Sequence, residues 1–137
     1  MKVVKLRRNR YLIFRIIRKS GRSIAFSDVL NAIFSSLSSL FGEVGSSKIS
    51  FSLMKYCPEL GIGILRCDHL SVSKVRAALA LIKSISGDDV IFSVIKISGT
   101  FKKAEKILNN LSKQLITGGM KKPSQMSDLM DDVLATN

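Results

Sequence analysis

The stretch RYLIFRIIRK, residues 10–19, decides the fold of this 137-residue chain. Its apolar side chains fall on both alternating faces of an extended backbone: Leu12, Phe14 and Ile16 on one face, Tyr11, Ile13 and Ile17 on the other. A strand that is apolar on both faces has to be covered on both sides. The pattern therefore predicts a central strand with a layer of structure against each face, ended by Ser20-Gly21.

Three further strand patterns follow along the chain. SKISFSLMKY (47–56) alternates apolar and polar residues, and LGIGILRC (60–67) resumes after a Cys57-Pro58-Glu59 turn. Two short strands joined by a turn of this kind predict a hairpin. DVIFSVIKIS (89–98) is the fourth strand pattern, and it leads through Ser98-Gly99-Thr100 into a helical pattern.

Four helices are predicted from apolar residues at spacings of three and four. The first starts at Ser27, which is a capping residue type, and ends at Gly42. The second opens at Ser71 or Ser73 and ends at Gly87, with a buried face of Val72, Val75, Leu79, Ile82 and Ile85. The third covers residues 100–116, and a short fourth covers 124–135.

The order β-α-β-β-α-β, followed by helices, predicts an α+β fold. It is typical of the ferredoxin-like or RRM-like sandwich. Right-handed crossovers then give a four-stranded antiparallel sheet in the order 4-1-3-2. We expect residues 1–116 to form this sandwich, with a basic N-terminal arm and the third helix. Residues 117–137 are expected to be an acidic C-terminal helical tail.

The charge is strongly basic and uneven. The net charge is +12, residues 1–22 hold nine Lys and Arg and no acid, and residues 123–137 hold three Asp and no base. A large basic excess points to a polyanion as partner, and this layout is common among nucleic-acid-binding proteins. No membrane-spanning pattern is present. Cys57 and Cys67 make no disulfide framework and indicate free thiols in a reducing compartment.

The predicted topology gathers basic residues at one edge of the sheet, where the first strand begins and the third and fourth strands end. A helix N-terminus binds phosphate through free N–H groups, glycine permits close approach, and arginine holds phosphate oxygens in pairs. The plainer reading of Ser98-Gly99-Thr100 is a turn and a helix cap. The predicted RNA-binding residues are Arg7, Arg8, Arg10, Arg66, Ser98, Gly99, Thr100, Lys102 and Lys103.

Other chemistry is weakly supported. His69 is the only histidine, and Cys57 and Cys67 lack the spacing of a zinc site, so we expect no metal site and no catalytic centre. LGIGILRC lacks the aromatic residues with which an RRM sheet stacks bases. We therefore expect the third and fourth helices, or a partner, to cover the second face, and RNA to be contacted at edges and loops through its backbone.

Three segments together resemble the small Pop-five-type protein subunit of archaeal and eukaryotic ribonuclease P. They are Arg10-Tyr11-Leu12, GILRC (63–67) and SGTFKKAEK (98–106), and the similarity covers roughly residues 7–112. The resemblance implies an RRM-like sandwich in a ribonucleoprotein that cleaves the 5′ leader from precursor tRNA, with RNA as the catalyst. It also implies that Arg10, Arg66, Gly99 and Thr100 help to hold that RNA.

The resemblance implies partners as well. These are the ribonuclease P RNA, precursor tRNA and a larger TIM-barrel-like protein subunit, assembled as a heterotetramer. It implies no cofactor on this chain, with Mg²⁺ required by the catalytic RNA. An archaeal member would be cytoplasmic, whereas a eukaryotic member would be nuclear or nucleolar and would also serve ribonuclease MRP.

Two other functions remain open from the sequence. One is a ribosomal or other ribonucleoprotein assembly protein with the same fold, with self-association through an apolar helix stripe or a sheet edge. The other is a small acylphosphatase-like enzyme, because one fold hosts many functions. The loop KSGRS (19–23) matches that enzyme class poorly.

Overall fold

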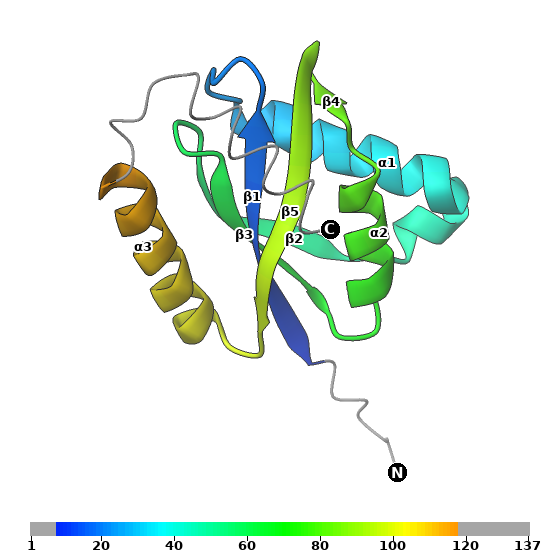
Figure 1. The fold of residues 1–137 in the computed structure, drawn as a ribbon. Coiled ribbons are helices and arrows are strands. Elements are labelled where there is room, and N and C mark those ends of the chain that lie inside the picture. The colour runs from blue at the N-terminus through cyan, green and yellow to red at the C-terminus, as the bar shows by residue number, and fades with distance from the viewer. Residues whose placement is uncertain (1–7, 118–137) are drawn as a thin grey trace.

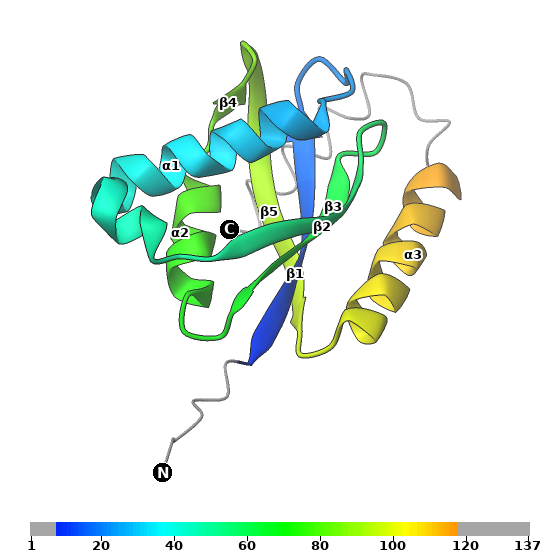
Figure 2. The ribbon, with the colours of Figure 1, turned by 180° about the vertical axis from the view of Figure 1, so that it is seen from behind.

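The computed structural model describes residues 8–117. The elements in chain order are β1 (Asn9–Arg18), α1 (Phe26–Ser47), β2 (Phe51–Cys57), β3 (Ile62–Asp68), α2 (Val72–Ala80), β4 (Ser84–Ile85), β5 (Asp88–Ser98) and α3 (Phe101–Thr117). The fold is α+β, with a curled antiparallel sheet between α1 and α2 on one side and α3 on the other (Figures 1 and 2). No helix within residues 8–117 is long and apolar enough to cross a membrane.

The sheet has five strands, in the order β2-β3-β1-β5-β4. The four predicted strands are β1, β2, β3 and β5, and their predicted order is confirmed. The prediction of four strands was wrong because β4, only Ser84–Ile85, pairs with the start of β5. Two residues are too few to show periodicity. Ser86 and Gly87, which join β4 to β5, both have positive φ, 53° and 81°, as a tight hairpin turn requires.

The second helix ends earlier than predicted. α2 stops at Ala80, and Ile82 and Ile85 are buried from the following loop and from β4 instead of from the helix. Their three-residue spacing continued the helical pattern by coincidence. The prediction that Ile82 and Ile85 are buried is therefore confirmed, but the prediction that they belong to the second helix was wrong.

The first helix also departs from its prediction at both ends. α1 begins at Phe26 after Ala25, and no side chain caps it, so Ser27 is not the cap. Gly42 breaks the helical backbone with φ 71° and ψ 174°, but helical structure resumes and runs to Ser47. Gly42 is a kink inside the helix and not its end.

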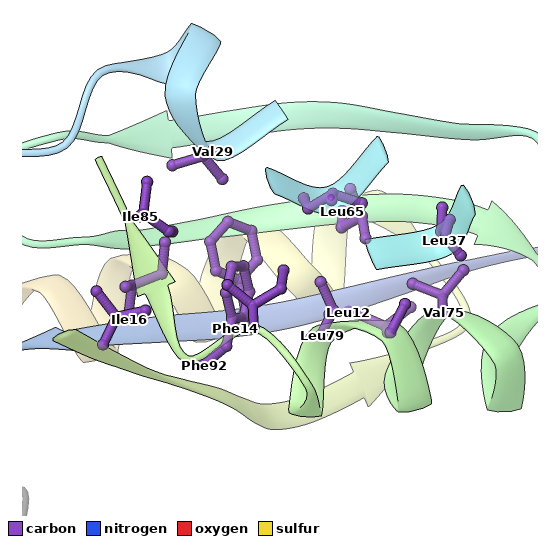
Figure 3. Packing of buried hydrophobic residues seen from close by; sticks show 14 of the residues in the cluster. Leu12, Phe14, Ile16, Val29, Leu37, Leu65, Val75, Leu79, Ile85 and Phe92 are labelled. Atoms are coloured by element: carbon purple, nitrogen blue, oxygen red, sulfur yellow. The ribbon is translucent and has the colours of Figure 1, made fainter. Parts of the chain in front are cut away.

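Two apolar clusters lie on opposite faces of β1, as its two-sided pattern predicts. In Figure 3 the side chain of Phe14 lies at the centre of the larger cluster, among residues from the sheet and both helices of that face. The smaller cluster joins Ile13, Ile62 and Ile64 of the sheet to Ala104 and Leu108 of α3. The third helix thus covers part of the second face, while the predicted fourth helix (124–135) lies outside the described residues.

Candidate nucleic-acid interface

The predicted edge is the end of the sheet where β1 begins and β3 and β5 finish. In the strand register Arg10 pairs with Cys67, and Tyr11 pairs with Arg66 on one side and with Ser98 on the other. The Arg8 carbonyl accepts a hydrogen bond from the His69 backbone N–H at 2.8 Å. Residues that are about ninety positions apart in sequence therefore meet at one place, as the topology predicted.

The two arginines lie on opposite faces of this edge, because successive side chains of a strand alternate. Arg66 pairs with Tyr11 and shares its face, which is the face of α3. Arg10 lies on the other face, and its Nη1 is 3.9 Å from the position that a Cβ would take on Gly99. The same Nη1 donates to the Asn9 carbonyl at 3.0 Å. Sequence reasoning found the edge but did not separate its two faces.

Ser98-Gly99-Thr100 forms a capped helix start. The Thr100 hydroxyl accepts a hydrogen bond from the Lys103 N–H at 3.3 Å, and the buried Ser98 hydroxyl accepts one from the Thr100 N–H at 3.3 Å. The capping interpretation is therefore confirmed. The N–H groups of Phe101 and Lys102 still have no acceptor within the helix, and the helix dipole places positive charge there. A capped start and an anion site are thus compatible.

The cations of this edge are largely open to solvent. Arg8, Lys102 and Lys103 are exposed, and Arg10 and Arg66 are half-buried. Within residues 8–117 the only ion pair joins Lys55 to Glu105 on α3, so no carboxylate pairs with these five cations. Arg7, the remaining predicted residue, lies outside the described residues.

One feature of the edge was missed from the sequence. The rings of Tyr11 and Phe101 make an edge-to-face contact, with centroids 5.8 Å apart and ring planes at 63°. In the sequence Tyr11 belongs to the apolar strand pattern and to the segment Arg10-Tyr11-Leu12, and Phe101 belongs to the segment SGTFKKAEK. The strand pairing places one ring beside the start of α3, and no spacing within the sequence shows that contact.

Groups of catalytic type are few in the described part of the chain. Burial, and to a smaller degree the Asp68 carboxylate, raises the pKa of the Cys67 thiol to about 11, so it is protonated at neutral pH. The Cys57 Sγ lies 3.3 Å from Glu59 Oε2. No three or more His, Cys, Asp or Glu residues among residues 8–117 are grouped to hold a metal ion.

Comparison with known proteins supports the family resemblance noted in the sequence. Residues 10–109 match the model of the Rpp14/Pop5 family. The chain is 36% identical over 104 residues to ribonuclease P protein component 2 of Methanosarcina mazei, covering 75% of this chain and 86% of that protein. It is 34% identical over 112 residues to the ribonuclease P/MRP protein subunit POP5 of Schizosaccharomyces pombe, covering 72% and 81%.

A solved structure shows the same fold. One chain of the yeast ribonuclease MRP cryo-EM structure superposes with a TM-score of 0.57 at 10% identity, over 86% of this chain and 98% of that one. The family match covers the central sheet, α1, α2 and the start of α3, including the capped turn at Ser98-Gly99-Thr100. The resemblance noted in the sequence is confirmed, and the chain belongs to the Rpp14/Pop5 family.

Proposed function

We infer that this chain is a protein subunit of ribonuclease P, the ribonucleoprotein that removes the 5′ leader of precursor tRNA. The family membership and the relatives named as ribonuclease P components support this role. We propose further that the chain binds the phosphate backbone of the catalytic RNA. The observation that carries this is that cations with no carboxylate partner in the described part of the chain meet a capped helix start at one sheet edge.

The chemistry of the edge suits phosphate. Guanidinium groups bind phosphate oxygens two at a time, and the start of α3 offers free N–H groups beside Gly99. Among residues 8–117, a Cβ on Gly99 would have only the Arg10 guanidinium within 4 Å, so the backbone there is open to approach. The proposed contacts to the RNA backbone are made by Arg7, Arg8, Arg10, Arg66, Ser98, Gly99, Thr100, Lys102 and Lys103.

The placement of the arginines suggests how the RNA would lie. Arg10 and Arg66 lie on opposite faces of the same strand ends. An RNA backbone that passed around the end of the sheet would meet Arg10 beside Gly99 on one side and Arg66 beside Tyr11 on the other. Phosphate contacts of this kind set position and orientation without selecting a sequence.

The finer assignments belong to the same proposal. β1, α1, β2, β3, α2 and β5 follow the ferredoxin-like or RRM-like order, with β4 added at the edge. The partner is proposed to be a larger TIM-barrel-like subunit in a heterotetramer, with Mg²⁺ held by the RNA. A cytoplasmic location is proposed for an archaeal protein. The comparisons favour neither the ribosomal or assembly-protein alternative nor the acylphosphatase.

A salt titration tests the proposal. Replacing both Arg10 and Arg66 by Ala should weaken binding to the catalytic domain of ribonuclease P RNA. It should also lower the slope of log affinity against log salt by about 2, because each lost phosphate contact removes about one released counterion. The matched control is Arg22→Ala with Lys83→Ala, which removes two exposed charges from the opposite end of the sheet and should leave the slope unchanged.

Two results would contradict the proposal in different ways. If the double variant binds with the slope of the unchanged protein while its thermal unfolding is normal, the RNA site lies elsewhere. If the unchanged protein binds this RNA equally well at low and high salt, backbone recognition itself is wrong.

A further inference from the structure

Tyr11 lies at the centre of the candidate interface, between two neighbouring strands. It lies on β1 between Arg66 of β3 and Ser98 of β5, at the end of the three strands. Alternate side chains of a strand share a face, so Tyr11 lies on the same face as Ile13, which is buried under α3. Tyr11 is therefore the residue of that face nearest to the open end of the sheet. Farther along this face the neighbouring positions, Ile62 and Ile64, are aliphatic and fully covered.

The Tyr11 ring packs against Phe101 and is still partly exposed to solvent. Phe101 contacts it edge to face at 5.8 Å, the arrangement that aromatic pairs prefer. Tyr11 is half-buried, and its hydroxyl makes no hydrogen bond within residues 8–117. By contrast, the other tyrosine, Tyr56, donates its hydroxyl to the Ile24 carbonyl at 2.7 Å.

Contact with phosphates alone requires no aromatic group. The edge nevertheless places an aromatic ring at the strand position paired with Arg66, which has no carboxylate partner within residues 8–117. Aromatic rings and arginine planes stack on bases that are splayed out of a helix, whereas a continuous duplex keeps its base faces hidden. The combination is therefore suited to RNA in which at least one base is unpaired.

We propose that Tyr11, held by Phe101 and flanked by Arg66, is a stacking position for one unpaired RNA base. This inference rests on the proposed function and deepens it, since it names the structural class of RNA at the site. Arg10, Lys102 and Lys103 bind the backbone of any RNA. The Tyr11 position favours a loop or bulge over an uninterrupted duplex.

Two RNA probes of equal length separate stacking from charge. One is a hairpin whose single-stranded loop carries a fluorescent adenine analogue, and the other is a blunt duplex. Tyr11→Leu should weaken hairpin binding about tenfold, in line with the stacking contribution of one base. It should also abolish the quenching of the analogue that accompanies binding, and leave duplex affinity unchanged. Tyr11→Phe keeps the ring and should bind and quench like the unchanged protein.

Further variants guard against a merely structural effect. Phe34, an aromatic residue on α1 that is 52% exposed, provides the control, and Phe34→Leu should alter neither binding nor quenching. Phe101→Leu removes the brace and should reduce the quenching. The inference is overturned if Tyr11→Leu changes hairpin and duplex binding equally, or changes neither, while its unfolding is normal. Loss of binding in the Arg10 and Arg66 variant alone would then leave the proposed function standing.

Discussion

At the scale of single residues, Arg18 is the most unusual member of the fold. It is 3% exposed at the end of β1 and has no carboxylate partner within the described residues. Its guanidinium donates to the carbonyl oxygens of Pro58 at 2.8 Å and Glu59 at 3.0 Å, which tie the β2–β3 turn to the end of β1. Gly61 allows this closeness, because a Cβ there would lie 2.6 Å from the Ile16 carbonyl.

Arg18→Met should lower the free energy of unfolding by about 2 kcal/mol. The variant leaves two carbonyls without donors, and the removal of a buried charge offsets part of that loss. Urea denaturation measures it. Arg22→Met, at an exposed position nearby, should change stability by less than about 0.5 kcal/mol. A variant at position 18 as stable as the unchanged protein would show that the turn does not depend on these hydrogen bonds.

The sequence pattern could not reveal this role of Arg18. Arginine is mostly exposed in proteins, and near the end of a strand it is expected to reach solvent. Its burial depends on a turn about forty residues later in the chain, which the fold places over it. By contrast, the Thr100 cap involves only residues 98–103, and local spacing was enough to suggest it.

At the scale of elements, α1 shows how one glycine shapes a helix. Gly42, at φ 71° and ψ 174°, adopts a conformation that is essentially restricted to glycine. The chain turns there and completes a further helical stretch before β2. No atom of the described residues lies within 4 Å of a Cβ placed on Gly42, so the expected cost of a side chain at this position is backbone strain.

Gly42→Ala should therefore destabilise the protein by about 2 kcal/mol through backbone strain. Ser38→Ala, at an exposed position of the same helix, should change stability by no more than about 0.5 kcal/mol. Thermal and urea unfolding of both variants provide the comparison. An equally stable Gly42 variant would mean that α1 can straighten at this point without loss of packing.

At the scale of the whole molecule, β1 couples the two apolar clusters. Alternate residues of this one strand enter the cluster under α1 and α2 and the cluster under α3. The two layers share their central strand, so we expect them to unfold together although no side chain belongs to both clusters.

Leu108→Ala tests this coupling. Leu108 is 7% exposed in the cluster under α3, and its truncation should lower the free energy of unfolding by about 3 kcal/mol. Ile33→Ala is the matched variant on the opposite face. Both should still unfold in a single transition with the same dependence on urea. A separate early transition in the Leu108 variant would show that α3 detaches as an independent unit.

The sequence by itself determined the elements whose signals are local. Two-sided alternation in residues 10–19 predicted a strand covered on both faces, helical spacing predicted α1 and α3, and the chain order predicted the strand order. The sheet edge with Arg10, Arg66 and Thr100 followed from that order. These predictions succeeded because hydrophobic periodicity can be read within a single segment, and crossover handedness depends only on the order of the elements.

Only the tertiary structure decided the features that depend on contacts between distant segments. They include the early end of α2, the burial of Arg18 and the pairing of Tyr11 with Phe101. The physical reason is the same in each case. Arg18 is buried by the β2–β3 turn, and Tyr11 meets Phe101, because the packed sheet sets their neighbours. Local spacing carries no information about neighbours so far away in the chain.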